Sequence, residues 1–244
     1  MVSKNQIKTI TGLQQKKYRK EHKMFIAEGV KVVEELLNSH FELQQLFTTQ
    51  NDFTNIPHGK RVEVTDAELK KISALTTANT CLAVFSIPED ENKLPDSGLI
   101  VALDEVRDPG NLGTIIRMCD WFGVTHLVCS HGCVDVYNPK VIQATMGSVT
   151  RVKVIYTDLQ GYLKNTSLPV YGTFMDGENI YTQSLPQNGI VVFGNEANGI
   201  SQEIEDVVTN KISIPRFGKL QQTESLNVAT ATAIILSEFR RSLS

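Results

Sequence analysis

The second half of the chain alternates short apolar runs with helical patterns. Six runs have the length and composition of buried strands: LIVAL, THLVC, VKVIY, PVYGTF, GIVVFG and KISIP. Stretches with apolar residues at helical spacing lie between most of them. Short apolar strands that alternate with helices indicate a parallel sheet covered on both faces. The pattern therefore predicts an α/β domain over residues 99–244, with ligands bound in the loops at the carboxyl ends of strands.

The first half has smaller elements. MFIAE, the stretch around LQQLF, RVEV and CLAVF are typical of strands, and GVKVVEELLNS has apolar residues at helical spacing. The stretch PEDENKLPDSG holds two prolines, a glycine and a cluster of acids, a composition typical of a linker. We therefore expect a small α/β domain over 1–90, a linker over 91–98 and the larger domain over 99–244.

One polar loop, DEVRDPGNLG, follows the strand LIVAL and leads into a helix. The helix carries an apolar stripe that includes Leu112, Ile115 and Ile116, and at about 100° per residue Arg117 lies on the opposite side. We expect Asn111 to be the N-cap, because a short polar side chain satisfies free backbone donors there. Taken alone, the loop favours the simpler interpretation of a capped helix that bears a surface arginine.

Two further polar loops follow other strands of this domain. GNEANGIS places glycines directly after GIVVF, where they allow backbone to approach a ligand closely, although a simple surface turn explains it equally well. The third loop leads to TESLNVATATAIILSEFRRSL, which predicts a C-terminal helix that starts near Ser225 or Asn227. Turn polarity alone does not explain why Ser, Leu and Asn fall together there.

Charge adds one candidate surface. The formal net charge is -3 and the pI is near 6.0, which argues against a protein that coats nucleic acid through bulk charge. Basic residues nevertheless gather near the N-terminus against a single Glu21: Lys4, Lys8, Lys16, Lys17, Arg19, Lys20 and Lys23. Such a local patch suits phosphate contacts. Taken alone, however, this basic run favours a solvated N-terminal helix, and the case for RNA depends on other features.

Composition also excludes several classes of protein. No apolar run is long enough to span a bilayer, and the N-terminus has no apolar signal core. We therefore expect a cytoplasmic protein that does not associate with a membrane. The four cysteines are too unevenly spread for a disulfide framework. His126, Cys129, His131 and Cys133 lie close together, but structural zinc sites draw ligands from two separated segments. We therefore expect no metal.

The three loops together resemble the signature motifs of the SpoU (TrmH-like) RNA 2′-O-ribose methyltransferases of the SPOUT superfamily. DPGNLGTIIR resembles the first motif, FGNEANGIS the second, and ISIP followed by ESLNVATATA the third, in the order and spacing of the family. The resemblance covers residues 99–244, and YNPKVIQATMGS resembles the family's intervening helix. KKYRKEHKMFIAEGVKVVEELL resembles the small substrate-binding domain that often precedes this catalytic domain.

The resemblance implies methyl transfer from S-adenosylmethionine to a ribose hydroxyl, with ribosomal RNA favoured over transfer RNA as substrate. It also implies a trefoil knot and a homodimer. The positions that match the family's catalytic residues are Arg117, Asn111, Glu196, Ser225 and Asn227. Those expected to bind the cofactor are Thr173, Gly194, Asn195, Gly199, Ile214 and Leu226. From the basic patch we expect Lys16, Lys17, Arg19 and Lys20 to face solvent and contact RNA.

We interpret Arg117 as a clamp on a phosphate rather than as the base, because a guanidinium stays protonated in proteins. The sequence departs from the family in an elongated turn, GKLQQTES, and in Thr145, which stands where a serine is common. Two alternatives remain open: a non-catalytic RNA-binding protein of the same fold, such as a ribosome assembly factor, and a base methyltransferase of the same superfamily.

Overall fold

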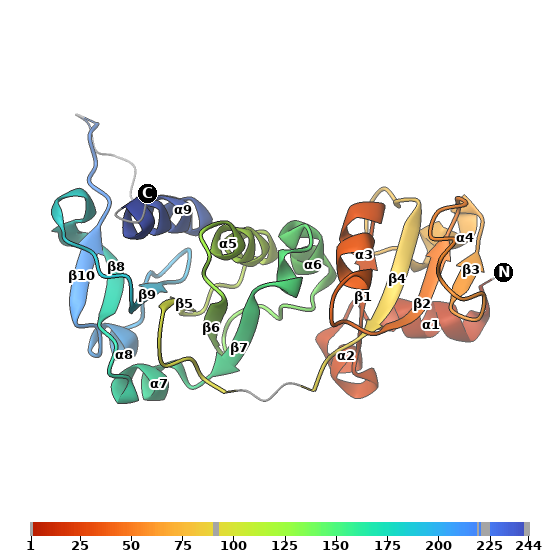
Figure 1. Ribbon diagram of the computed structural model, residues 1–244, viewed down its shortest axis with the longest axis horizontal. Helices are drawn as coiled ribbons and strands as arrows, with labels where there is room; N and C mark the ends of the chain where they lie inside the picture. Colours follow the sequence, from red (N-terminus) through yellow and green to blue (C-terminus); the bar gives the residue numbers. More distant parts are fainter. Residues whose placement is uncertain (1, 90–92, 219, 221–224, 242–244) are drawn as a thin grey trace. The chain divides into compact units, whose positions relative to one another are not determined.

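The computed structural model describes residues 2–89, 93–218, 220 and 225–241. The chain divides into two compact units. The first unit comprises Met1–Asp90 and Asp135–Thr150, and the second comprises Glu91–Val134 and Arg151–Ser244. Figure 1 labels the elements of both.

The second unit contains a six-stranded sheet whose neighbouring strands are all parallel, which confirms the prediction from the strand–helix alternation. Its spatial order is β10-β8-β9-β5-β6-β7. Both central strands, β5 and β9, are buried at every position, because helices cover both faces of a parallel sheet. The strand bounds are β5 (Leu99–Leu103), β6 (His126–Ser130), β7 (Lys153–Thr157), β8 (Val170–Asn179), β9 (Gly189–Phe193) and β10 (Asn210–Ser213).

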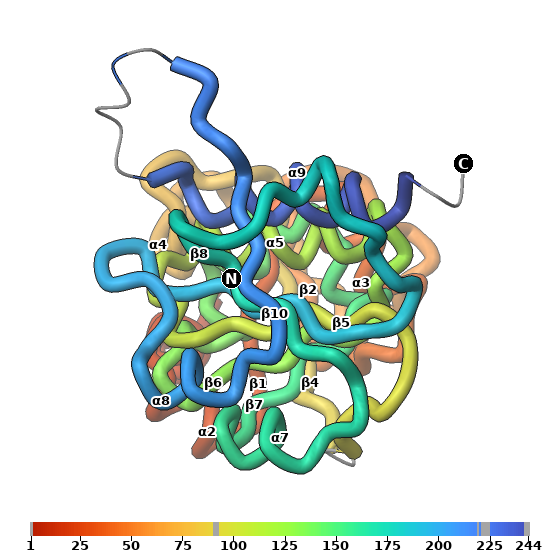
Figure 2. Tube along the Cα trace, turned by 90° about the vertical axis from the view of Figure 1, so that its left-hand side faces the viewer, coloured from red at the N-terminus to blue at the C-terminus, as the bar shows by residue number. Residues whose placement is uncertain are grey.

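Two pairs of helices cover this sheet. Figures 1 and 2 show α5 (Pro109–Trp121) and α9 (Val228–Arg241) side by side on one face, with α7 (Leu159–Asn165) and α8 (Gln202–Glu205) on the other. Arg240 joins α9 to the end of α5, because its guanidinium donates to the carbonyls of Phe122 (2.8 Å) and Gly123 (3.1 Å). The 3-10 turn η2 (Ile180–Thr182) follows β8.

Strand β8 bulges from its ladder with the edge strand β10. The register passes from Lys211 opposite Gly172 to Ile212 opposite Glu178 in one step, so residues 173–177 of β8 lie in the bulge. Thr173, which the sequence places near the end of a strand, is therefore the first residue of a bulge inside a longer strand.

The first unit has a small mixed sheet of order β1-β4-β2-β3. Its strands are β1 (Met24–Glu28), β2 (Leu43–Thr48), β3 (Arg61–Glu63) and β4 (Cys81–Ser86). β4 runs antiparallel to both of its neighbours, whereas β2 and β3 are parallel. The helices from the N-terminal part are α1 (Lys4–Gly12), α2 (Lys16–His22), α3 (Val30–Leu37) and α4 (Asp66–Ile72). This unit confirms the expected small α/β fold.

The segment Asp135–Thr150 belongs to the first unit, although it lies in the sequence between two strands of the second. It contains α6 (Pro139–Thr145) and the turn η1 (Ser148–Thr150). Helix α6 packs against β1, and the ring of Tyr137 lies 4.8 Å from that of Phe25. Thr145 is buried, and its hydroxyl donates to the carbonyl of Ile142, which gives it a structural role.

Candidate active site

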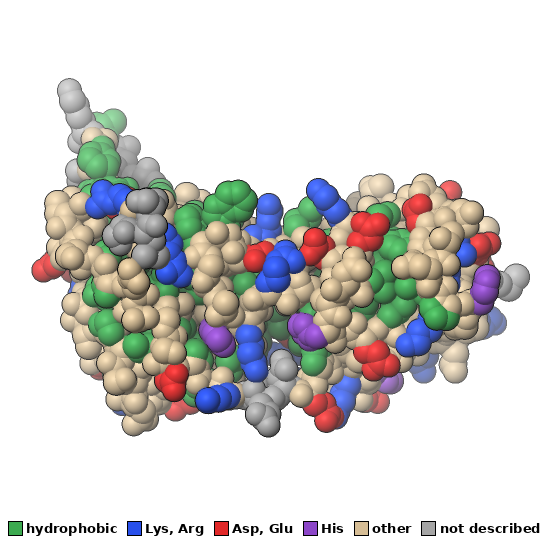
Figure 3. Space-filling view, viewed as in Figure 1, with side chains coloured by type: hydrophobic (Ala, Val, Ile, Leu, Met, Phe, Trp, Pro, Cys, Tyr) green, Lys and Arg blue, Asp and Glu red, His purple; other side chains and the backbone are tan. Residues whose placement is uncertain are grey.

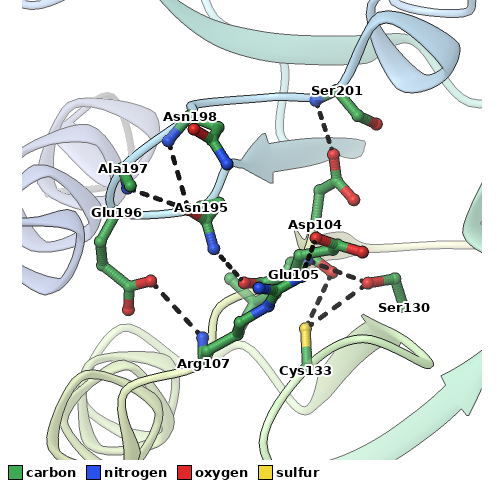
Figure 4. A network of polar contacts seen from close by, with 11 residues as sticks. Asp104, Glu105, Arg107, Ser130, Cys133, Asn195, Glu196, Ala197, Asn198 and Ser201 are labelled. Carbon is green, nitrogen blue, oxygen red and sulfur yellow. Dashed lines mark hydrogen bonds and ion pairs between the residues drawn. The ribbon is translucent and has the colours of Figure 1, made fainter.

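The loops after β5, β9 and β10 leave the same edge of the parallel sheet. The first two are described completely, and the third is described except for residues 219 and 221–224. Figure 4 shows that polar contacts join the first two loops directly. The buried Asp104 carboxylate accepts a hydrogen bond from the amide of Ser201 (2.8 Å). Sequence reasoning missed this pair, whose only signal was an acidic residue at the end of a buried strand.

Glu105 holds the first loop in a sharp turn. Its backbone is in the left-handed region (φ 55°), which is uncommon for a residue with a side chain. Its amide donates to the Ser130 hydroxyl (2.9 Å), its carbonyl accepts from the Asn195 amide group (2.7 Å), and its carboxylate pairs with Arg107 (2.6 Å). Figure 4 shows Ser130 and Asn195 on opposite sides of Glu105. The neighbouring loops therefore stabilise this turn.

The N-cap of α5 is Asp108, so the expectation that Asn111 occupies this position is wrong. The Asp108 carboxylate accepts from the Asn111 backbone amide (2.8 Å), and Pro109 is the first helical residue. Proline favours the first helical position because its fixed φ suits the helix and its missing N–H needs no partner. Asn111 consequently lies in the first turn, where its side chain is not needed for capping.

Asn111 links the three loops through its side chain. Its amide nitrogen donates to Glu196 (2.9 Å), which comes from the loop after β9. Its amide oxygen accepts from the side chain of Asn227 (2.9 Å), which precedes α9. Asn227 also caps α9, because its side-chain oxygen accepts from the backbone amides of Ala229 (3.0 Å) and Thr230 (3.2 Å). The chain Glu196–Asn111–Asn227 thus joins three of the predicted catalytic residues.

Glu196 is held as a carboxylate. Burial raises the pKa of Glu196, but hydrogen bonds from Asn111 and from backbone amides together lower it by more than burial raises it. The pKa therefore lies below its ordinary value. Two of these amides belong to Arg107 (3.5 Å) and Asp108 (3.3 Å), beside the start of α5. A helix N-terminus also favours negative charge. Glu196 is therefore suited to accept hydrogen bonds rather than to donate a proton.

Arg117 points away from the core of its unit, as its position on the helix predicts. Its side chain is exposed, and within the described ranges it forms neither a hydrogen bond nor an ion pair. It lies six residues after Asn111 on α5, a rise of about 9 Å. Ser225 is also exposed and has no hydrogen bond with another described residue, so the structure does not join it to the Asn111 chain.

The predicted cofactor residues follow neighbouring strands. Gly194 follows β9, Ile214 follows β10, and Thr173 lies in β8 between those strands. Ile214 is half-buried, and Leu226 is 49% exposed. This exposure leaves an apolar surface that a purine ring could cover. A pocket of about 330 Å³ also lies along β8 and β10; of the described motif residues only Ile212 lines it, and none of the residues expected to bind the cofactor does.

The loop after β9 closes on itself at Gly194. Asn195 and Gly199 form a pair of backbone hydrogen bonds (2.8 and 2.9 Å), and a Cβ on Gly194 would lie 2.1 Å from the Gly199 carbonyl carbon. The close approach that requires glycine here is thus to the protein's own backbone. The Asn195 side chain is engaged in turn, since its oxygen accepts from the amides of Ala197 and Asn198.

The basic candidates divide into two groups. Lys16, Lys17 and Lys20 are exposed on α2, as expected. The expectation that Arg19 faces solvent is wrong, because Arg19 is only 2% exposed and forms an ion pair with Asp135 (2.5 Å). Its partner is 116 positions away in the sequence, so local charge patterning could not reveal the pair.

The cysteine and histidine cluster divides between core and surface, since His126 is half-buried and His131 is exposed. Cys129 and Cys133 are buried, and the Cys133 thiol donates to the carbonyl of Leu103 (3.3 Å). In the part of the chain that the structure describes, no three His, Cys, Asp or Glu side chains are grouped to hold a metal. No described helix combines the length and apolar character needed to cross a membrane.

Comparison with known proteins identifies the class to which this fold and site belong. Residues 98–237 match the SpoU rRNA Methylase family, and residues 4–83 match the MRM3-like substrate binding domain. The chain belongs to the SpoU family of RNA methyltransferases.

Individual relatives span both units. The chain is 32% identical to the 23S rRNA (guanosine(2553)-2′-O)-methyltransferase RlmP of Bacillus subtilis (strain 168), over 98% of this chain and 97% of the relative. A TrmH-family protein from Porphyromonas gingivalis superposes with a TM-score of 0.89 at 40% identity, over 99% of each chain. The AdoMet-bound rRNA methyltransferase from Sinorhizobium meliloti gives 0.87 at 29% identity, over 100% of this chain and 98% of that one.

Proposed function

We propose that this protein methylates the ribose 2′-hydroxyl of a ribosomal RNA nucleotide, with S-adenosylmethionine as the methyl donor. The observation that carries the proposal is the series of hydrogen bonds Glu196–Asn111–Asn227, which connects the three motif loops to one another. Its central residue, Asn111, lies on α5, the helix that also carries Arg117. The Bacillus subtilis relative, an rRNA 2′-O-methyltransferase similar over nearly the whole chain, supports the substrate class.

The reaction requires the hydroxyl to be aligned and its proton to be removed, because the donor's sulfonium methyl is already activated. Arg117 binds the phosphate beside the target ribose and stabilises the charge that develops on the oxygen. Glu196, Asn111 and Asn227 fix the start of α5 relative to the other two loops, and so fix Arg117. The exposed hydroxyl of Ser225 is available to the ribose.

S-adenosylmethionine fits the loops at this edge of the sheet. It supplies the electrophilic methyl group. We assign its binding to Thr173, Gly194, Asn195, Gly199, Ile214 and Leu226. The half-buried Ile214 and the exposed Leu226 offer apolar surface for the adenine, whereas Asn195 contributes through backbone because its side chain is already engaged. The AdoMet-bound relative from Sinorhizobium meliloti supports this assignment.

RNA binding is assigned to residues 1–90, and catalysis to residues 99–244. The exposed Lys16, Lys17 and Lys20 provide phosphate contacts. On the face shown in Figure 3, acidic and basic side chains are interspersed. We also propose a cytoplasmic location, which the bacterial origin of the Bacillus subtilis relative supports.

We further propose a trefoil knot and a homodimer. The return of the chain from the edge strand β10 to α5 supports the knot, because Asn227 and Arg240 bind Asn111 and the end of α5. Trp121, which is 83% exposed on α5, supports the dimer, since burying an indole is favourable. Light scattering at micromolar concentration should give twice the monomer mass, and a fully active monomer would refute the dimer.

Incubation with labelled S-adenosylmethionine and unmodified total RNA tests the function. The label should enter ribosomal RNA, and nucleoside analysis should yield a 2′-O-methylated nucleoside. Label on a base would make the protein a base methyltransferase. RNA binding without transfer would make it a non-catalytic RNA-binding protein.

A further inference from the structure

The connection between β6 and β7 contributes a segment to the first unit. These strands are parallel neighbours, so the chain between them is a crossover connection of the sheet that carries the active site. Most of this connection, Asp135–Thr150, nevertheless belongs to the first unit, where α6 contacts β1. Both ends of the segment continue directly into the second unit.

A buried ion pair anchors the start of this segment. All three guanidinium nitrogens of Arg19 are bonded: Nε and Nη2 donate to Asp135 Oδ2 (2.9 and 2.5 Å), and Nη1 donates to the carbonyls of Leu13 and Gln14 (2.9 Å each). The side chains of Arg19 and Asp135 are 2% and 16% exposed. An arginine bonded in this way has no face left for a phosphate, so its role lies within the protein.

Two further contacts hold the same segment. Tyr137 packs against the rings of Phe25 (4.8 Å) and Phe41 (6.4 Å). At the other end, a Cβ on Gly147 would lie 2.6 Å from the side chain of Glu35, so only glycine allows this approach without a shift. The segment is therefore held at its start by the ion pair of Asp135 and is closely packed near its end at Gly147.

The residues just before Asp135 hold the catalytic loop. Val134 donates its backbone amide to the carbonyl of Val106 (3.0 Å), in the middle of the first motif loop. Cys133 donates to the carbonyl of Leu103 (3.3 Å), and the Ser130 hydroxyl accepts from the amide of Glu105 (2.9 Å). One peptide bond thus separates the Arg19 anchor from the contact that supports this loop.

We propose that Arg19 is a positioning residue, which acts through Asp135 and Val134 to fix the loop that orients Glu196 and Asn111. The proposal rests on the proposed function in one respect, namely that this loop is catalytic. Loss of the ion pair frees the Asp135 carboxylate from Arg19 and loosens the bond from Val134 to Val106, while the Val134 carbonyl stays bonded to the Tyr156 hydroxyl (2.6 Å). The loss therefore impairs the chemical step and leaves phosphate contacts intact.

Hydrogen exchange on the full chain tests the structural part without any assay of activity. In the wild-type protein, the denaturant dependence of exchange at the Val134 amide should follow that of the Phe25 amide in the core of the first unit. In Asp135→Asn and in Arg19→Gln, exchange at Val134 should be accelerated. If exchange at the Val134 amide of the wild-type protein instead follows exchange at Leu127 in β6, the ion pair does not control Val134 and the proposal is wrong. This comparison needs only the wild-type protein, so it holds even if neither variant folds.

Kinetics test the functional part. Arg19→Gln should lower kcat by roughly tenfold to a hundredfold, a usual effect of misplaced catalytic groups, with the RNA KM and its salt dependence unchanged. Lys31→Gln, on an exposed lysine of the same unit, is the inert control. Lys20→Gln is the comparator for a phosphate contact and should flatten log affinity against log salt by about 0.7–0.9. If Arg19→Gln flattens the salt dependence and spares kcat, Arg19 contacts RNA and the proposal fails. If exchange at Val134 is accelerated in the variants but the wild-type protein transfers no methyl group, only the proposed function is refuted.

Discussion

Gly194→Ala is predicted to damage the cofactor loop through a collision with backbone. The new Cβ would lie 2.1 Å from the Gly199 carbonyl carbon, 2.2 Å from the Ile200 nitrogen and 2.4 Å from the Gly199 oxygen. Backbone cannot rotate away as a flexible side chain can, so the paired segments must separate. Separation breaks the two hydrogen bonds between Asn195 and Gly199. At about 1 kcal/mol each, their loss costs about 2 kcal/mol.

Two other glycines calibrate this effect. Gly199 has φ 69° and open space around its Cβ position, so Gly199→Ala adds only backbone strain of about 1 kcal/mol. Gly59 has nothing within 4 Å of its Cβ position, so Gly59→Ala should change the free energy of unfolding by less than about 0.5 kcal/mol. The expected order of destabilisation is therefore Gly194, Gly199, Gly59.

Urea unfolding and calorimetric titration with S-adenosylmethionine measure the two consequences. Gly194→Ala should lower the free energy of unfolding by about 2 kcal/mol. It should also weaken cofactor binding by more than about tenfold, since 1.4 kcal/mol corresponds to a factor of ten. The reasoning is refuted if Gly194→Ala unfolds and binds the cofactor as Gly59→Ala does.

Three further predictions follow from other parts of the chain. Arg117→Ala should abolish methyl transfer and leave cofactor affinity nearly unchanged, because the side chain points away from the core; a collapse of calorimetric binding would place it in the cofactor site instead. Charge reversal of Lys16, Lys17 and Lys20 should weaken RNA binding and flatten its salt dependence without unfolding the chain, and retention of full affinity would identify a merely solvated helix. Glu28→Gln should remove a pH dependence of stability. Burial raises the pKa of the Glu28 carboxyl above its ordinary 4.5, so the native state holds the proton more tightly than the unfolded state does. Wild-type stability therefore falls as the pH rises from 4.5 through the raised pKa. The variant should gain stability relative to wild type over that window, and a constant difference in urea unfolding would contradict this sign.

The sequence by itself determined the strands of the catalytic sheet and their parallel arrangement. Residues buried on both faces leave continuous apolar runs, and these runs identify strands such as β5 and β9 without knowledge of their neighbours. Helical periodicity likewise predicted that Arg117 faces outward. The N-cap of α5 was also within reach of sequence, since Pro109 marks the first helical position and so points to Asp108.

Only the tertiary structure decided which polar groups meet. The motifs brought Asn111, Glu196 and Asn227 together as candidates, but their direct hydrogen bonds join residues 85 and 116 positions apart. Arg19 belongs to a basic run that looks uniform in sequence, yet it is buried because Asp135 lies opposite it in the folded chain. Local periodicity records which face of an element is apolar, whereas the partner of a buried charge is set by contacts between distant segments, and these leave no periodic trace in the sequence.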